Sequence, residues 1–357
     1  NGEIMEPIDL SMANRDDPGH FNSTGEAFRH WDEDGEVSGS CTRCHTSEGL
    51  PFLLEHDVTI SFEPSNSLSC STCHLDISEG DFSVRPIIDV EFPSGAVVSF
   101  GDEGEADEAN VCIVCHQGRN SSPGLEGFIA RAGVGDDDVS EALRFQNPHY
   151  FAAGATLFGA DAEGGYQYEG MDYSGRNIHT RRVNSCVDCH DVHALTLQVD
   201  RCIDCHEEFE DTDDPHTIRL DEDYDPVDYD GDGDVEEPIY DEIASYQDAL
   251  LAGIYDYAAN TVGTPIVYDS HAYPYWFIDT NGDGMATPDE ANYGNQFNQW
   301  TPRLLRATYN FTWSVKDPGA FAHNPDYILQ LLFDSLMDVG GEDAVAGFTR
   351  APNNWMD

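Results

Sequence analysis

The last third of the chain contains three segments in which apolar residues recur at helical spacing. They span residues 243–259, 302–311 and 325–339. The third is the best defined, because Asn324 can cap its first turn, Pro325 suits the first helical position and Gly340 can end it. A further helix is predicted over about 140–158, with an interruption near Pro148.

β-Branched and aromatic residues gather in shorter runs elsewhere. Residues 87–92 and 96–100 flank a Pro-Ser-Gly turn and predict a β-hairpin. Residues 195–199 also have strand composition, whereas the Gly- and Tyr-rich stretch 164–175 indicates a loop. Residues 207–242 include 18 acidic side chains and one Arg, which indicates a linker or a segment that depends on cations.

All ten cysteines belong to five copies of Cys-x-x-Cys-His, numbered here as motifs one to five. The copies are Cys41/Cys44/His45, Cys70/Cys73/His74, Cys112/Cys115/His116, Cys186/Cys189/His190 and Cys202/Cys205/His206. Each is the attachment signature of haem c, in which two thiols bond to the porphyrin vinyl groups and the His becomes the proximal iron ligand. Two intervening residues let both sulfurs reach one edge of the macrocycle. The sequence therefore predicts five covalently bound haem c groups.

Zinc knuckles and redox dithiols also use Cys-x-x-Cys pairs. Neither explains why His follows every pair, and a disulfide framework does not predict that His either. Haem attachment by this route takes place outside the energy-transducing membrane, so export is expected. A start at Asn1 without a signal h-region fits a processed form, and no apolar run approaches the ~18 residues that span a bilayer. We expect an extracellular or cell-surface location, with the periplasm as the alternative.

The spacing of the motifs bounds the fold class. Five haems between residues 41 and 206 leave about 33 residues for each, too few for an ordinary apolar core. We therefore predict a mostly irregular and α-helical fold with minor β-structure, whose core is packed haem. The predicted domains are a pentahaem domain over 1–206, an acidic linker or cation-binding segment over 207–242, and a haem-free, mainly helical C-terminal domain over 243–357.

The charge is strongly negative, with 16 basic against 69 acidic residues and a formal net charge of −53. Such a surface argues against nucleic acid and anionic membranes as partners. It favours solubility in strong salt, where repulsion is screened within a few Å. The single Lys and the abundant Asp suggest a saline habitat, although a plain solvated surface explains the charge nearly as well.

Nine histidines lie outside the motifs and can supply the second axial ligand of each iron. Histidine on both faces gives low-spin iron suited to electron transfer. The favoured distal ligands are His20, His30, His149, His179 and His193. His193 is the strongest, since it lies three residues after His190 and can serve a neighbouring haem. His56 and His216 are open between ligation and surface roles, and a structural role is favoured for His271 and His323.

Two acidic loops are predicted to bind calcium. Residues 279–290 match the twelve-residue EF-hand loop, with Gly284 at the sharp turn and oxygen ligands from Asp279, Asn281, Asp283, Thr287 and Glu290. The residues before this loop do not look helical, so a complete helix–loop–helix unit is not expected. A second loop copies the first half with Asp228, Asp230, Asp232 and Asp234. It has Ile239 at the closing position, where Asp241 or Glu242 could substitute. Bound ions would offset the charge that opposes folding of this region.

The five motifs, the Cys-His-x-x-His element at 189–193 and Asn147-Pro-His-Tyr150 resemble multihaem c-type cytochromes of extracellular respiration. The resemblance covers mainly residues 20–206. It implies haems packed edge to edge and redox partner proteins or extracellular acceptors, and some members polymerise into filaments. Ammonia-forming pentahaem nitrite reductases use Cys-x-x-Cys-Lys at the catalytic haem, whereas every motif here ends in His.

Electron transfer through five bis-His haems, with self-association into a filament, is the leading functional hypothesis. The protein is then an electron carrier and not an enzyme. The alternatives are a reductase with one open haem and a soluble periplasmic electron shuttle. A high-spin ferric haem would favour the reductase, and failure to assemble would favour the shuttle.

Overall fold

The structure is a computed structural model that describes residues 20–21, 26–180, 182–194, 196–206, 214–219 and 227–353. The chain forms two compact units. Unit 1 comprises Asn1–Val90, Ser99–Cys115 and Arg182–Asp204, and unit 2 comprises Glu91–Val98, His116–Arg181 and Cys205–Asp357. The three-part division predicted from the sequence stays a prediction.

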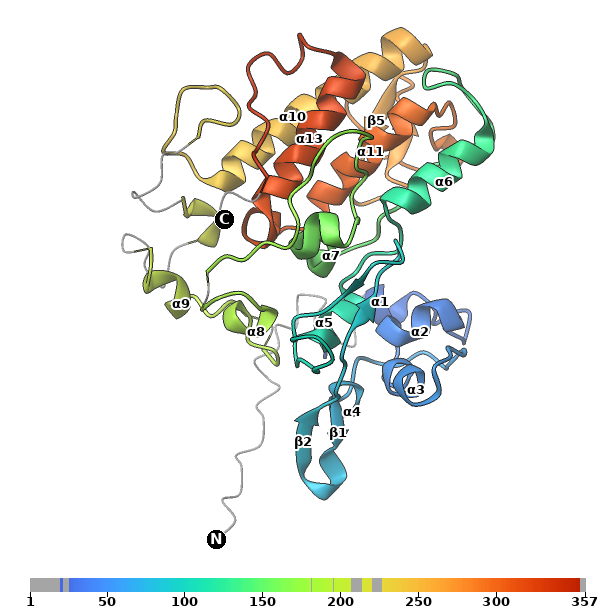
Figure 1. Ribbon diagram of the computed structural model, residues 1–357. Helices are drawn as coiled ribbons and strands as arrows, with labels where there is room; N and C mark the ends of the chain where they lie inside the picture. The colour runs from blue at the N-terminus through green and yellow to red at the C-terminus, as the bar shows by residue number, and fades with distance from the viewer. Residues whose placement is uncertain are drawn as a thin grey trace. The chain divides into compact units, whose positions relative to one another are not determined.

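Unit 1 consists of short helices and turns (Figure 1). Its elements are α1 (Glu26–Arg29), α2 (Gly39–His45), α3 (Gly49–His56), α4 (Cys70–Cys73), β1 (His74–Asp76), η2 (Ile77–Glu79), β2 (Asp81–Val84), α5 (Asn110–Cys115), α8 (Cys186–Cys189) and α9 (Asp200–Ile203). Few of its described apolar side chains are buried, Val37, Leu50 and Ile113 among them. An apolar core this small cannot by itself order so many turns. This agrees with the expectation that the spacing of the motifs leaves too few residues for an ordinary apolar core.

The described residues among the first hundred form two hairpins. The predicted one is confirmed with shorter strands, β3 (Val90–Glu91) and β4 (Val97–Val98), which are neighbours in a two-stranded sheet. Its turn closes where Phe92 N donates to Ala96 O at 2.8 Å. The other hairpin, antiparallel β1–β2, was not predicted, because its strands carry few β-branched residues and β1 begins at His74, the last residue of motif two.

Unit 2 is built on three helices that pack side by side, α10 (Ile239–Tyr257), α11 (Pro302–Val315) and α13 (Pro325–Gly340), as Figure 1 shows. Its other elements are α6 (Ser122–Ala132), α7 (Ala153–Phe158), η3 (Gly159–Asp161), η4 (Pro215–Thr217), the π-helical turn η5 (Ala258–Val262), β5 (Ile266–Tyr268), β6 (Trp276–Ile278), η6 (Tyr293–Asn295) and α12 (Ala320–His323). Strands β5 and β6 pair antiparallel. The largest fully buried side chains include Trp276, Trp300 and Trp313.

All three predicted C-terminal helices form. α13 begins and ends within one residue of the prediction, and the Asn324 side chain accepts from Tyr327 N at 3.1 Å as its cap. α11 runs four residues past the predicted end. α10 starts at Ile239, inside the segment predicted to be a linker. Pro238 precedes this start, and Asp241 and Glu242 in the first turn face the positive end of the helix dipole.

The helix predicted over 140–158 is wrong for most of its length, since only α7 forms. Pro148 has no N–H to donate, and His149 and Phe151 adopt left-handed backbone angles, with φ of 85° and 50°. The helix that does form nearby is α6, over 122–132, which the apolar pattern did not reveal. Its signals were Ser121, whose side chain caps Gly124 N at 3.2 Å, and Gly133 at the left-handed end.

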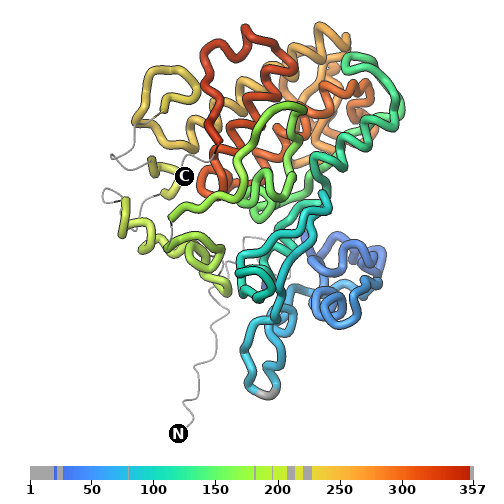
Figure 2. The backbone as a smooth tube through the Cα atoms, in the orientation of Figure 1, coloured from blue at the N-terminus to red at the C-terminus, as the bar shows by residue number. Residues whose placement is uncertain are grey.

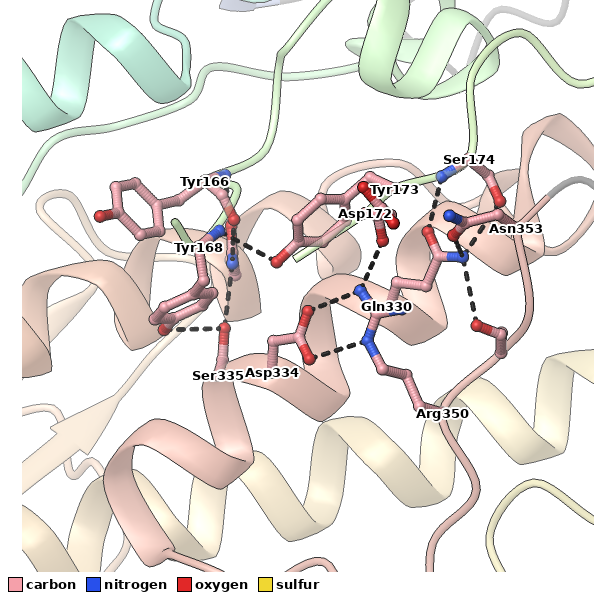
Figure 3. A network of polar contacts seen from close by, with 12 residues as sticks. Tyr166, Tyr168, Asp172, Tyr173, Ser174, Gln330, Asp334, Ser335, Arg350 and Asn353 are labelled. Atoms are coloured by element: carbon pink, nitrogen blue, oxygen red, sulfur yellow. Dashed lines mark hydrogen bonds and ion pairs between the residues drawn. The ribbon is translucent and has the colours of Figure 1, made fainter. Parts of the chain in front are cut away.

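The predicted loop 164–175 forms, and its two ends are buried against α11 and α13, whereas residues 169–172 are exposed. A Cβ on Gly164 would lie 2.4 Å from the Trp313 ring, and one on Gly165 would lie 2.2 Å from Leu331. Figure 2 shows this segment running beside the helices, and Figure 3 shows polar bonds that hold its end. Gln330 accepts from Ser174 N at 2.8 Å, and Arg350 donates to Asp334 at 2.8 Å.

The strand predicted over 195–199 is not formed by its described residues. Leu195 lies outside the described part of the chain, and Leu197 makes only an isolated bridge to His190. In the described parts of the chain we find no helix with the length and apolar character needed to cross a bilayer.

Candidate haem and cation sites

The cysteine pairs sit on single helical turns. Those of motifs one to four lie within α2, α4, α5 and α8, and the pair of motif five starts in α9 and continues just past its end. On a helical turn, residues three apart project from the same face. None of the ten cysteines, all of which are described, forms a disulfide. This placement fits two thioether bonds from each turn to one porphyrin edge.

In three motifs a backbone carbonyl fixes the proximal imidazole. Nδ1 of His45 lies 2.9 Å from Ala27 O, Nδ1 of His74 lies 2.6 Å from Phe82 O, and Nδ1 of His116 lies 2.8 Å from Phe151 O. A carbonyl can only accept, so Nδ1 must carry the proton and Nε2 keeps its lone pair. Metal-binding histidines are held in this way. The acceptors are main-chain atoms, which no sequence motif could have revealed.

At motif three, burial also favours the neutral form of the proximal histidine. The His116 imidazole is partly buried, and this lowers its pKa below the ordinary value, while the Phe151 carbonyl and Asp317 act in the opposite direction. A neutral imidazole is the form that binds a metal. The position therefore suits an iron ligand better than a charged surface His.

Two predicted distal histidines face a proximal one. The ring centres of His74 and His193 are 6.1 Å apart, with 20° between the ring planes, inside unit 1. Those of His206 and His179 are 6.3 Å apart, with 44° between the planes, inside unit 2. Two imidazoles bound on opposite sides of one metal, at about 2.0 Å per metal–nitrogen bond, have centres about 6 Å apart. Both pairs match this spacing.

The other three favoured distal histidines lie close to motifs or their partners. His30 and the proximal His45 both contact the Trp31 ring, at 4.8 and 5.0 Å between centres. The carbonyl of His20 accepts from Leu68 N at 2.7 Å, two residues before motif two. His149 comes two residues before Phe151, whose carbonyl holds His116. Their roles as ligands stay predictions.

The remaining histidines have other neighbours. His56 lies against Phe52, at 4.3 Å between ring centres, and His271 is 94% exposed beside Asp269. His216 contacts the rings of Tyr240 and Phe321. Nδ1 of His323 lies 3.0 Å from both oxygens of the buried Asp317. That ion pair is consistent with the structural role favoured for His323.

Sulfur atoms of different motifs meet inside unit 1. Cys44 Sγ lies 4.0 Å from Val114 O, and Cys115 Sγ lies 3.6 Å from Arg43 O, so motifs one and three make reciprocal contacts. The Cys112 and Cys186 thiols are hydrogen-bonded to each other. Burial, together with the neighbouring Cys112, raises the pKa of the Cys73 thiol to about 11. Motif three is thus central among the attachment turns of unit 1.

The loop 279–290 follows strand β6 and not a helix, as expected from the residues that precede it. Asp279 accepts from Gly282 N at 2.6 Å and from Gly284 N at 3.0 Å. The carboxylate of Glu290, which is 3% exposed, accepts from Thr280 and Thr287. These bonds lower its pKa to about 2, so the carboxylate is charged at any physiological pH.

The loop that starts at Asp228 repeats this arrangement. Asp228 accepts from Gly231 N at 2.6 Å and from Gly233 N at 3.0 Å. Glu242, which is fully buried, accepts from the two residues after Asp228, as Glu290 does in the other loop. Glu242 therefore takes the closing position that Ile239 cannot fill.

Carboxylates converge more closely in the loop that starts at Asp228 than in the loop 279–290. Among the described residues, the acidic groups with oxygens close enough to share one cation are Asp228/Asp230/Glu242 and Asp230/Asp232/Glu237. Burial and the neighbouring carboxylates raise the pKa of Glu237 to about 7. Arg219 donates to Glu242 at 2.9 Å and partly neutralises this cluster.

Cys-x-x-Cys-His turns, proximal histidines held through Nδ1 and facing histidines are features of a multihaem c-type cytochrome, and comparison with known proteins supports this class. The chain is similar to the C-type polyheme cytochromes OmcB and OmcC of Geobacter sulfurreducens. It is 25% identical to OmcB over 88% of this chain and 46% of OmcB. Identity to OmcC is 24%, over 89% of this chain and 45% of OmcC. The chain thus spans about half the length of these curated relatives. No protein-family model and no solved structure matches it.

Proposed function

We propose that this protein carries electrons through five covalently attached haem c groups, each with histidine on both sides of the iron. The main support is that the ring of His193 lies opposite that of His74, and the ring of His179 opposite that of His206. Both distances between ring centres are those expected for two histidines bound to one metal ion. Haem supplies the redox change, and the chain supplies attachment, ligand orientation and water exclusion. Iron that is six-coordinate with histidine has no open position for a substrate, so electron transfer is favoured over reductase chemistry.

The contacts between motifs support a route through the motif-three haem. Its turn meets motif one through Cys115 and Arg43, and it meets motif four through Cys112 and Cys186. Groups attached to touching turns lie close enough for electron hopping. The proposed order of transfer therefore differs from the order of the motifs along the chain.

We propose an extracellular or cell-surface location, with redox proteins or extracellular acceptors as partners and with head-to-tail self-association into a filament. The similarity to polyhaem cytochromes supports the redox partners. Calcium is the proposed structural ion of the loops at 228–242 and 279–290. The first of these presents convergent carboxylate oxygens, and the second has oxygen-bearing residues at the EF-hand spacing. These ions would neutralise part of the net charge of −53.

The proposal is tested by counting the haems and their spin states. Intact mass should exceed the polypeptide mass by five haem groups, and the ten cysteines should resist alkylation. Electron paramagnetic resonance of the oxidised protein should show only low-spin iron. Fewer than five haems would remove at least one motif, and a stoichiometric high-spin signal would favour a reductase with an open haem.

A further inference from the structure

The chain has a single lysine, and its side-chain ammonium group is buried without a hydrogen bond to any described residue. Lys316 follows the last residue of α11 and is 8% exposed, and its Nζ has no hydrogen-bond partner among the described residues. Its ammonium lies 3.5 Å from the centre of the Tyr150 ring and 3.8 Å from that of Tyr275. The hydroxyls of these two tyrosines are hydrogen-bonded to each other. Lys316 thus lies in a two-ring aromatic cage, in which Tyr275 is buried and Tyr150 is 44% exposed.

The cage is joined to the proximal ligand of motif three by two successive backbone interactions within unit 2. Phe151 N donates to Lys316 O at 3.1 Å. The carbonyl of the same Phe151 accepts from His116 Nδ1 at 2.8 Å. Phe151, whose carbonyl orients His116, is therefore hydrogen-bonded to the backbone of Lys316.

Residues 149–151, which include the residue that makes these hydrogen bonds, have an unfavourable backbone conformation that other contacts must stabilise. His149 and Phe151 both have positive φ angles, an unfavourable conformation for residues with a Cβ. Ring faces attract an ammonium most strongly where water is excluded. The cage around Lys316 supplies such a contact at Tyr150, between the two unfavourable residues.

We infer that Lys316 is a positioning residue for the motif-three haem: by clamping Tyr150 and Phe151 it fixes the orientation of His116, and its charge favours the reduced state of that haem. The inference rests on the proposed haem binding at Cys112 and Cys115. It assigns to the C-terminal helical region, which carries no haem motif, a direct part in electron transfer.

A purely structural lysine would stabilise unit 2 without affecting one haem selectively. If the charge of Lys316 acts on the motif-three haem, it should also change the reduction potential of that haem. Reduction adds an electron, so a nearby positive charge raises the reduction potential, and in a low-dielectric interior this effect is larger than in water. Burial lowers the pKa of Lys316 to about 7, so measurements belong at pH 6, where the ammonium is protonated.

The test compares Lys316→Met, Lys316→Arg and Arg350→Met in the full-length protein with its haems attached. Lys316→Met removes the charge and keeps the length, and Lys316→Arg keeps the charge. Arg350 is the matched control: it is a partly buried cation of unit 2, and its described contacts are Asp334, Asp172 and Tyr173. The signal of the motif-three haem is assigned by its loss in a Cys112→Ala/Cys115→Ala variant.

Lys316→Met should lower the potential of the motif-three haem, reducing its ratio of reduced to oxidised iron by about tenfold at fixed applied potential, the scale of one unit charge acting through protein. Its low-spin resonance should broaden or shift, while the other haems keep theirs. Lys316→Arg should restore both properties, and Arg350→Met should change neither. Selective loss of haem at motif three in Lys316→Met would also support the clamp.

The inference is overturned if Lys316→Met leaves the potential and resonance of that haem unchanged, or if Arg350→Met alters them equally. If Lys316→Met does not accumulate, Lys316→Gln removes the same charge and is judged by the same two readouts. Failure of the underlying haem assignment would be seen separately, as an unchanged haem count in the Cys112→Ala/Cys115→Ala variant.

Discussion

At the scale of single residues, one hydrogen bond decides which nitrogen of a proximal histidine can bind iron. The carbonyls of Ala27, Phe82 and Phe151 accept from Nδ1, so Nε2 is the nitrogen with which these histidines would bind the proposed haem iron. A main-chain acceptor cannot be protonated or lost by a side-chain substitution. The orientation of these ligands is therefore robust to mutation nearby but sensitive to any shift of the carbonyl.

Replacing His193 with Ala should leave the motif-two haem without its facing imidazole. Its iron should become high-spin or bind water, while the other haems stay low-spin, because the ring at 6.1 Å from His74 is removed. Electron paramagnetic resonance and visible spectra of the oxidised protein measure this change. His271→Ala is the matched control, since this ring is 94% exposed. A fully low-spin spectrum in His193→Ala would exclude it as a ligand.

The buried pair of Asp317 and His323 predicts a pH-dependent stability. Burial disfavours both charges, but the Asp317 carboxylate raises the pKa of His323, and His323 lowers the pKa of Asp317. The stabilisation is thus complete between the unfolded-state pKa values of about 4 and 6.5, and it is lost as pH rises through the raised pKa of His323. Asp317→Asn should cost about 3 kcal/mol at pH 6 and clearly less at pH 9, as measured by urea unfolding. An equal loss at both pH values would contradict the ion pair.

At the scale of elements, the two acidic loops reach the same hydrogen-bonding pattern from different sequences. In one loop Glu290 closes at the regular twelfth position, whereas in the other the carboxylate comes from Glu242 in the first turn of α10. The helix turns this side chain back toward Asp228 and Asp230. Cation binding at this loop would therefore couple directly to the start of α10, the longest of the described helices.

Calcium should raise the melting temperature of unit 2, and Glu242→Gln should remove much of that gain. A ligand at 100 times its dissociation constant stabilises the folded state by about 2.7 kcal/mol. Calorimetry with calcium and with a chelator measures the difference. Asp241→Asn is the matched control, because Asp241 is exposed in the same helical turn. Asp279→Ala with Glu290→Ala should likewise reduce the stabilisation by calcium, at the loop 279–290, and should leave the haem spectrum intact. If neither change alters the calcium response, the loops are acidic turns only.

At the scale of the whole molecule, the net charge of −53 opposes any association of identical chains. Screening shortens the range of this repulsion from about 10 Å at 0.1 M salt to about 3 Å at 1 M. Basic residues are too few to offset it, since 16 stand against 69 acidic ones. Self-association must therefore depend on salt or on bound cations.

Light scattering and electron microscopy should show assembly that strengthens as salt or calcium increases. Deleting residues 1–31 removes His20 and His30, and it should yield monomers with one haem lacking its sixth ligand if this arm donates a ligand to a neighbouring chain. A truncated protein that still polymerises with five low-spin haems would exclude that donation. A full-length protein that stays monomeric in 1 M salt with calcium would favour the soluble shuttle.

Local patterns predicted elements well where the signals were contiguous. α13 could be placed because its cap, first proline and final glycine lie within its own sequence. The helix expected over 140–158 failed because backbone angles at His149 and Phe151 depend on bonds to distant residues, Lys316 among them. The loop 164–175 was recognised, but its burial against Trp313 and Leu331 required the packed helices.

The sequence alone determined the chemistry whose ligands are adjacent in the chain: five Cys-x-x-Cys-His motifs and two acidic loops, since a few bonds of backbone fix the reach of those side chains. Only the tertiary structure decided which histidines face each other, which carbonyls hold them, that Glu242 closes its loop and that Lys316 is caged. These depend on packing between residues that lie from 8 to 166 positions apart, and the spacing in the sequence does not fix the distances between them.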